Sequence, residues 1–138
     1  MFTHILSQSE RKVLVHAFAY LARIDQELHQ GELDRIVMVA RNLGLDPQII
    51  VDDVGRVDLD AMLQTIESEQ AKRIILQELL NLAYADGKYS EEERQGIIHV
   101  TRIFGIDRPL LEQIEKWVAT GRSWVQEGDR LFLITQSD

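Results

Sequence analysis

The chain has 138 residues, of which 45 % are hydrophobic, and this is enough for one domain whose core needs no disulfide or structural metal. It has no cysteine, which excludes disulfides and thiolate metal sites and suits a reducing cytoplasm. The net charge of −8 disfavours nucleic-acid binding and attracts cations, and no stretch reaches the roughly 20 apolar residues of a transmembrane helix.

Hydrophobic periodicity and helix start and stop signals predict helices along most of the chain, because only two prolines and eight glycines interrupt it. Two S-x-x-E capping boxes, at Ser7 and Ser90, and glycine stops at Gly44 and Gly105 mark helix ends. In chain order, the predicted helices cover residues 8–27, 31–43, 47–54, 59–66, 69–85, 91–104 and 108–119.

The C-terminal tail is less well determined by its sequence. After Gly121 it contains Trp124 and an apolar run at residues 131–134, and both a last helix and an extended arm packed on the bundle remain open. Trp117, in the preceding predicted helix, is expected to lie in the core, whereas Trp124 fits the core or an interface equally well.

An internal repeat appears when the chain is shifted by 61 positions, which aligns residues 11–50 with 72–111 without a gap. Nine of the forty pairs are identical: Leu21/Leu82, Ala22/Ala83, Asp25/Asp86, Glu32/Glu93, Ile36/Ile97, Val39/Val100, Arg41/Arg102, Gly44/Gly105 and Asp46/Asp107. Core packing, helix stops and helix caps explain most of these pairs. The two acidic pairs are harder to explain, because the aspartates continue an apolar stripe and a carboxylate there needs hydrogen bonds or a cation.

These observations predict an all-α fold, a compact bundle of six to eight helices built from two helical repeats related by a pseudo-twofold axis. The chain is expected to be a single domain, 1–138. Its predicted parts are a first repeat at about 9–50, a connector at 51–68, a second repeat at about 69–117 and a C-terminal tail at 118–138.

The segment from Asn81 to Arg94, NLAYADGKYSEEER, resembles the TerB-like family of bacterial tellurite-resistance proteins. The shared pattern is an A-x-A-D-G segment that closes one helix, with a glutamate seven residues after the aspartate. The stretch 22–32 is similar to the family's earlier copy of this unit, although Ile24-Asp25-Gln26 replaces Ala-Asp-Gly. The resemblance covers roughly residues 9–117. It implies a helical bundle of stress-response systems, without known catalytic activity, whose acidic residues are proposed to bind a divalent cation.

The candidate metal ligands are therefore Asp86 and Glu93 first, and Asp25 and Glu32 second. Oxygen-only ligands point to a hard cation, Ca²⁺ or Mg²⁺, although the loop lacks the glycine and acid spacing of an EF-hand. Each Asp and its Glu should lie within one coordination shell. The alternative is structural, because Ser90 and Glu93 are also explained as a helix-capping box.

No catalytic centre is expected, since the sequence has no phosphate-binding loop, nucleophile elbow or E-x-x-H pair of a di-iron bundle. The first hypothesis is a non-enzymatic stress-response module, like the tellurite-resistance proteins, that binds a divalent cation. The alternative is a protein-interaction or scaffold domain whose acidic residues are structural. A protein partner of unknown identity, no nucleic acid, no membrane insertion and a cytoplasmic location are expected, and the sequence leaves the oligomeric state open.

Overall fold

The structure is a computed structural model that describes residues 2–23, 30–53, 56–85 and 89–133. Within these ranges it has seven α-helices, one 3-10 turn and no strand, which confirms the predicted all-α class and helix number. The elements are η1 (Thr3–Ile5), α1 (Gln8–Arg23), α2 (Gln30–Asn42), α3 (Pro47–Asp53), α4 (Leu59–Gln64), α5 (Glu69–Ala85), α6 (Glu91–Phe104) and α7 (Arg108–Phe132).

The predicted helix-end signals form as expected. The Ser7 hydroxyl accepts a hydrogen bond from the Glu10 amide at 3.2 Å, and the Ser7 amide donates to Glu10 Oε1 at 2.8 Å. Gly44 and Gly105 both adopt left-handed conformations, with φ of 75° and 72°, which glycine reaches without steric cost. These short-range signals set the ends of the helices before any tertiary contact is considered.

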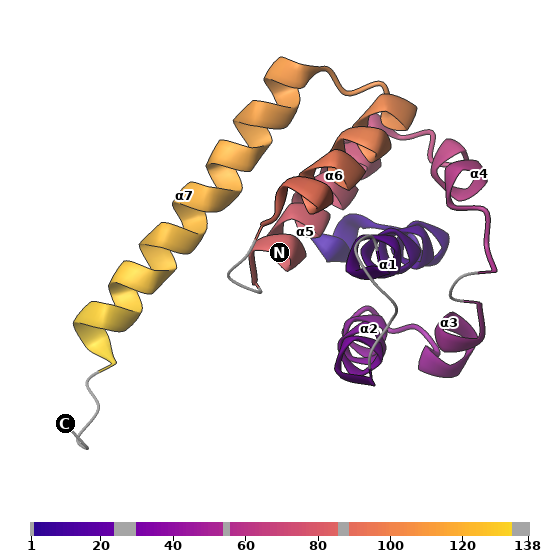
Figure 1. Cartoon of the computed structure of the whole chain (residues 1–138), viewed down its shortest axis with the longest axis horizontal. Coiled ribbons are helices and arrows are strands. Elements are labelled where there is room, and N and C mark those ends of the chain that lie inside the picture. The colour runs from indigo at the N-terminus through magenta and orange to yellow at the C-terminus, as the bar shows by residue number, and fades with distance from the viewer. Residues whose placement is uncertain (1, 24–29, 54–55, 86–88, 134–138) are drawn as a thin grey trace.

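Helix α5 is the centre of the bundle, because every residue from Ile74 to Leu80 is buried. It packs against α1, α6 and α7, while α2 and α3 lie on the far side of α1 (Figure 1). The short helix α4 bridges α1 and α6. None of the helices described is both long and apolar enough to cross a membrane.

Helix α7 is longer than the sequence predicted. It was expected to end near Ala119, but it continues through Gly121 and Gly128 to Phe132 and extends beyond the bundle (Figure 1). We call residues 108–122 the anchored segment and residues 123–132 the projecting segment. The first packs on α5 through buried Leu111 and Val118, and every residue from position 123 to 133 except the partly buried Gly128 is exposed.

The two predicted repeats share their local features, although their superposition stays a prediction. In each, a long helix is followed by a second helix that ends at a left-handed glycine and then by an aspartate that caps a third helix. The Asp46 carboxylate accepts from the Gln48 amide at 2.9 Å, and the Asp107 carboxylate accepts from the Leu110 amide at 3.0 Å. The third helices, however, differ in length, with 7 residues in α3 and 25 in α7.

Candidate functional site

The second acidic junction lies at the start of α6, where Glu93 takes part in a complete capping box. Ser90 Oγ accepts a hydrogen bond from the Glu93 amide at 3.1 Å, and the Ser90 amide donates to Glu93 Oε1 at 3.2 Å. Both residues are partly buried. The capping function predicted for this pair is therefore confirmed, and it occupies one of the two carboxylate oxygens of Glu93.

The four predicted metal ligands fall into two groups. Glu32 and Glu93 each lie in the first turn of a helix, α2 and α6. Asp25 and Asp86 lie outside the described residues, so their pairing with the two glutamates stays a prediction. In the described ranges, no three histidine, aspartate or glutamate side chains group closely enough to hold a metal ion.

A polar network fixes the start of α6 against α7. Arg94 donates to both carboxylate oxygens of Glu115, at 2.9 Å and 3.1 Å, and the Tyr89 hydroxyl donates to Glu115 Oε2 at 2.9 Å. The Tyr84 ring lies 4.8 Å from that of Tyr89, measured between centroids. Because two charged groups and two rings meet here, the residues on both sides of 86–88 are held to the bundle.

The environment of this network changes the acidity of its members. Burial, and then the hydrogen bond to Glu115, raises the pKa of Tyr89 well above its usual value. The hydrogen bond to Glu115 also raises the pKa of Arg94. Both shifts favour the observed protonated forms, so the Tyr89 hydroxyl is a donor throughout the physiological range.

Sequence reasoning missed this network, because its members are far apart in the chain. Glu115 is 21 positions from Arg94 and 26 from Tyr89. Nothing local marks Glu115 as a partner of α6. Its place on the face of α7 that turns toward the bundle was the one available signal.

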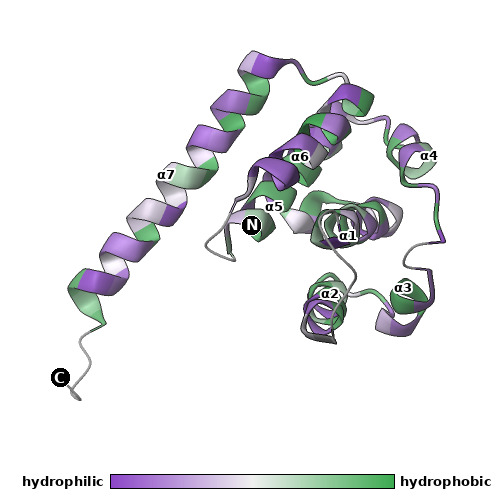
Figure 2. Ribbon diagram, viewed as in Figure 1, coloured by the Kyte–Doolittle hydropathy of each residue, from purple (hydrophilic) through white to green (hydrophobic). Residues whose placement is uncertain are grey.

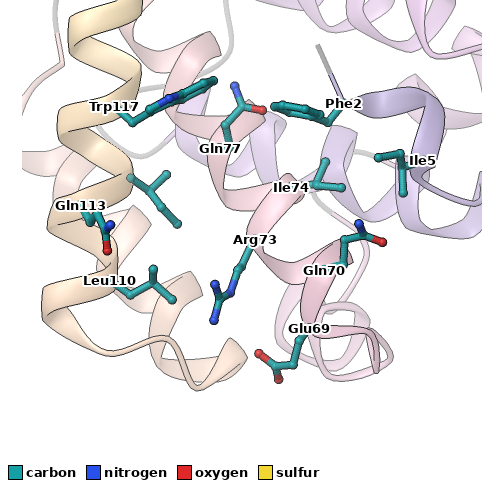
Figure 3. Close-up of a pocket in the computed structure, with 11 residues that line it drawn as sticks. Phe2, Ile5, Glu69, Gln70, Arg73, Ile74, Gln77, Leu110, Gln113 and Trp117 are labelled. Atoms are coloured by element: carbon teal, nitrogen blue, oxygen red, sulfur yellow. The ribbon is translucent and has the colours of Figure 1, made fainter.

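A groove of about 740 Å³ opens between η1, α5 and the anchored segment of α7 (Figure 3). Its lining is mainly apolar, with Ile74 and Leu110 on the two long helices. The Phe2 and Trp117 rings meet across it, with centroids 6.4 Å apart. The expectation that Trp117 lies in the core is wrong: its side chain is 51 % exposed and forms a wall of the groove.

The family model described as tellurite resistance protein TerB matches residues 50–116. The predicted resemblance to the TerB family is confirmed. The TerB match spans Asp86 and Glu93 but begins after Asp25 and Glu32, so it covers the second acidic junction alone.

A solved structure supports the fold. The crystal structure of a tellurite resistance protein from Nostoc punctiforme PCC 73102 superposes with a TM-score of 0.69 over 97 % of this chain and 87 % of that one, at 19 % identity. At this identity the likeness establishes the helical fold and its arrangement. Comparison with curated proteins gives no significant match.

Proposed function

We propose that this chain is a non-enzymatic, tellurite-resistance-like module of bacterial stress response that binds a divalent cation. In this proposal, Asp86 and Glu93 form the principal site for Ca²⁺ or Mg²⁺, and Asp25 and Glu32 form a second one. The expected cytoplasmic location and the absence of nucleic-acid binding stay predictions.

The observation that carries the proposal is the extent of the family match. It spans both members of the Asp86–Glu93 pair, whose spacing of seven residues the first junction repeats. The same match supports the order of the two sites, because the first junction lies outside it.

The donor chemistry fits a hard cation. Carboxylate oxygens are the ligands that Ca²⁺ and Mg²⁺ prefer, and the chain has no thiol to favour a softer metal. At Glu93 the capping box uses Oε1, so Oε2 is the oxygen that would reach a cation. The competing stabilisation comes from the amides at the start of α6, which already favour a negative charge at this position.

Calorimetric titration and thermal melting with Ca²⁺ and Mg²⁺ test the proposal. Binding to the folded state alone stabilises it by about 2.7 kcal/mol at a hundredfold excess over Kd, so the melting temperature should rise. Asp86→Asn should abolish the rise. Glu93→Gln is the sharpest variant, because glutamine keeps the capping box and removes the charge. Glu92→Gln is the matched control, because Glu92 is an exposed glutamate in the same first turn.

Two results would overturn the cation site. The first is a wild-type protein that binds neither ion. The second is unchanged binding in Asp86→Asn and Glu93→Gln, which would leave the acidic junction with capping as its role.

The second candidate function is a protein-interaction module, and a specific observation favours it. Trp124, Val125, Leu131 and Phe132 are exposed on the projecting segment of α7, and large apolar patches on soluble proteins mark contact sites. The two candidates separate cleanly, because an interaction module shows no specific melting response to Ca²⁺ or Mg²⁺.

A further inference from the structure

Helix α7 carries one continuous apolar and small-residue stripe along both of its segments. Its members are spaced alternately four and three residues apart, which is the heptad spacing of helices that pack side by side. In order, the stripe consists of Leu110, Ile114, Trp117, Gly121, Trp124, Gly128 and Leu131. The first three line the groove, and the stripe then continues past the end of the bundle.

The projecting segment is therefore built like a packed helix but lies in the open. Trp124 is 78 % exposed and Phe132 is 79 % exposed. Figure 2 shows that the apolar face of α7 reaches its C-terminal end, where no described helix of the bundle lies beside it. Removing such side chains from water is favourable, so a surface that covers them would bind to this segment.

Two glycines on this stripe have no function inside a single copy of the chain. Gly121 and Gly128 sit inside a helix, where glycine is unfavourable, and neither has a positive φ. A methyl group added to either would meet nothing within 4 Å. Small residues at heptad positions are useful when the backbone of a second helix approaches closely.

The groove contains a buried polar atom that lacks a hydrogen-bond partner. Gln77 lies in its floor between the rings of Phe2 and Trp117 (Figure 3). Its side chain is only 8 % exposed, and its Oε1 has no hydrogen-bond partner in the described part of the chain. A buried amide oxygen without a donor is costly. An occupant of this groove should therefore be apolar and aromatic and should bring one N–H group.

We propose that the occupant is the projecting segment of a second copy of this chain, so that two α7 helices pack antiparallel across a twofold axis. Each copy then fills the groove of the other, as a self-complementary twofold interface requires. The indole N–H of Trp124 is a donor without acceptor capacity, which suits Gln77 Oε1.

In one antiparallel register, large side chains of the stripe in one copy lie opposite glycines of the stripe in the other. A register that places Trp117 of one copy opposite Gly121 of the other also places Leu110 opposite Gly128. Trp117 and Leu110 thus each meet a glycine, and Trp124 is placed opposite Ile114, a residue that lines the groove. The two glycines lie seven residues apart, which is also the separation of Leu110 and Trp117, the residues that they face in this register.

Electrostatics permit a second copy at this surface. The chain carries a net charge of −8, which opposes self-association in general. The projecting segment, however, contains only Glu127, Asp129 and Arg130 as charged residues, for a net charge of −1. The rim of the groove also carries both signs, at Glu69 and Arg73. The proposed contact is therefore a place where two acidic copies can meet with little repulsion.

The inference specifies the partner of the interaction-module candidate and does not depend on cation binding. Sedimentation is measured in EDTA, from about 1 µM to about 500 µM protein, a range that brackets dimers of micromolar affinity. The wild type should form dimers. Trp124→Glu, an exposed position, should weaken them about thirtyfold or more, as loss of a central Trp does at interfaces. Ile5→Glu, on the opposite wall of the groove, should do the same.

Met38→Glu is the matched control, because Met38 is an exposed apolar residue on α2, away from α7. Its sedimentation should equal that of the wild type. A second readout uses Trp117→Phe, which leaves Trp124 as the only tryptophan of the two in the chain. Its fluorescence should shift to the blue and resist quenching as the protein concentration rises.

A wild type that stays monomeric over the whole range overturns the proposal, whatever else binds the stripe. So does a dimer that persists in Trp124→Glu. Either failure leaves the cation titrations unaffected, so the two proposals fail separately.

Discussion

The two segments of α7 have the same pattern and opposite surroundings. In residues 108–122, the stripe lines the groove, and the face beside it packs on the bundle, with Leu111 and Val118 buried and Glu115 held by Arg94. In residues 123–132, the pattern continues without a break, but every residue there except Gly128 is exposed. One helix therefore presents an intramolecular interface and then an unpartnered continuation of it.

This difference teaches that periodicity identifies the face of a helix but not the molecule that covers it. A heptad stripe buries the same area whether its neighbour belongs to its own chain or to another. The difference between the segments must then appear in energetics. Substitutions in the anchored segment should change the stability of the fold, and those in the projecting segment should change association.

The largest expected effect is the loss of a core contact in the anchored segment. Leu111 is 1 % exposed, so Leu111→Ala should lower the free energy of unfolding by about 2–5 kcal/mol, through lost burial and a cavity. Phe132→Ala removes a larger side chain from the projecting segment and should leave that free energy unchanged at low protein concentration. Urea denaturation of both variants makes the comparison, and equal losses would contradict it.

The next effect comes from the polar network that fixes the anchored segment. Glu115→Gln replaces the carboxylate that accepts from both Arg94 and Tyr89, and it should cost about 2 kcal/mol, the scale of a charged hydrogen-bonded pair. Glu127→Gln is the matched control, because its ion pair with Arg130 is exposed and lies in the projecting segment. A cost at Glu127 similar to that at Glu115 would remove the distinction between the segments.

The pH dependence of the melting temperature should also reveal the contact between Tyr89 and Glu115. Burial and the Glu115 hydrogen bond hold the pKa of Tyr89 above its unfolded value of about 10. The unfolded chain therefore releases this proton first, so the contribution is complete below pH 10 and is lost as the pH rises further. The melting temperature of the wild type should fall more steeply above pH 10 than that of Tyr89→Phe. Parallel curves for the two proteins would refute this.

The fold could be predicted from the sequence where local chemistry sets it. The capping boxes at Ser7 and Ser90 and the left-handed glycines Gly44 and Gly105 bound helices within a few residues. Gly121 misled the prediction, because a glycine inside a helix and a glycine that ends one look alike without tertiary context. Trp117 misled it as well, since a stripe does not reveal how deep each residue lies.

The candidate site was less predictable, for a physical reason. Glu93 was placed correctly, because a capping box is determined within four residues. Glu115 could not be found, because ion pairs between helices depend on how those helices cross. Asp25 and Asp86 lie outside the described residues, so their pairing with Glu32 and Glu93 stays a prediction, which the titrations with Ca²⁺ and Mg²⁺ test.

The smallest expected effect lies in the projecting segment, where one substitution should stabilise the helix and weaken self-association. Gly128→Ala gains helix propensity of about 0.5–1 kcal/mol in the single chain, where the added methyl meets nothing. Because the projecting segment makes no contact with the core, this gain should appear in slower hydrogen exchange of its amides rather than in a higher melting temperature. In the dimer the same methyl faces a second helix, so self-association should weaken while the isolated helix becomes more stable. Hydrogen exchange at low protein concentration measures the effect on the helix, and sedimentation at high concentration measures the effect on self-association. Tighter association in Gly128→Ala would mean that the glycine does not face a partner helix, and the antiparallel register would then be wrong.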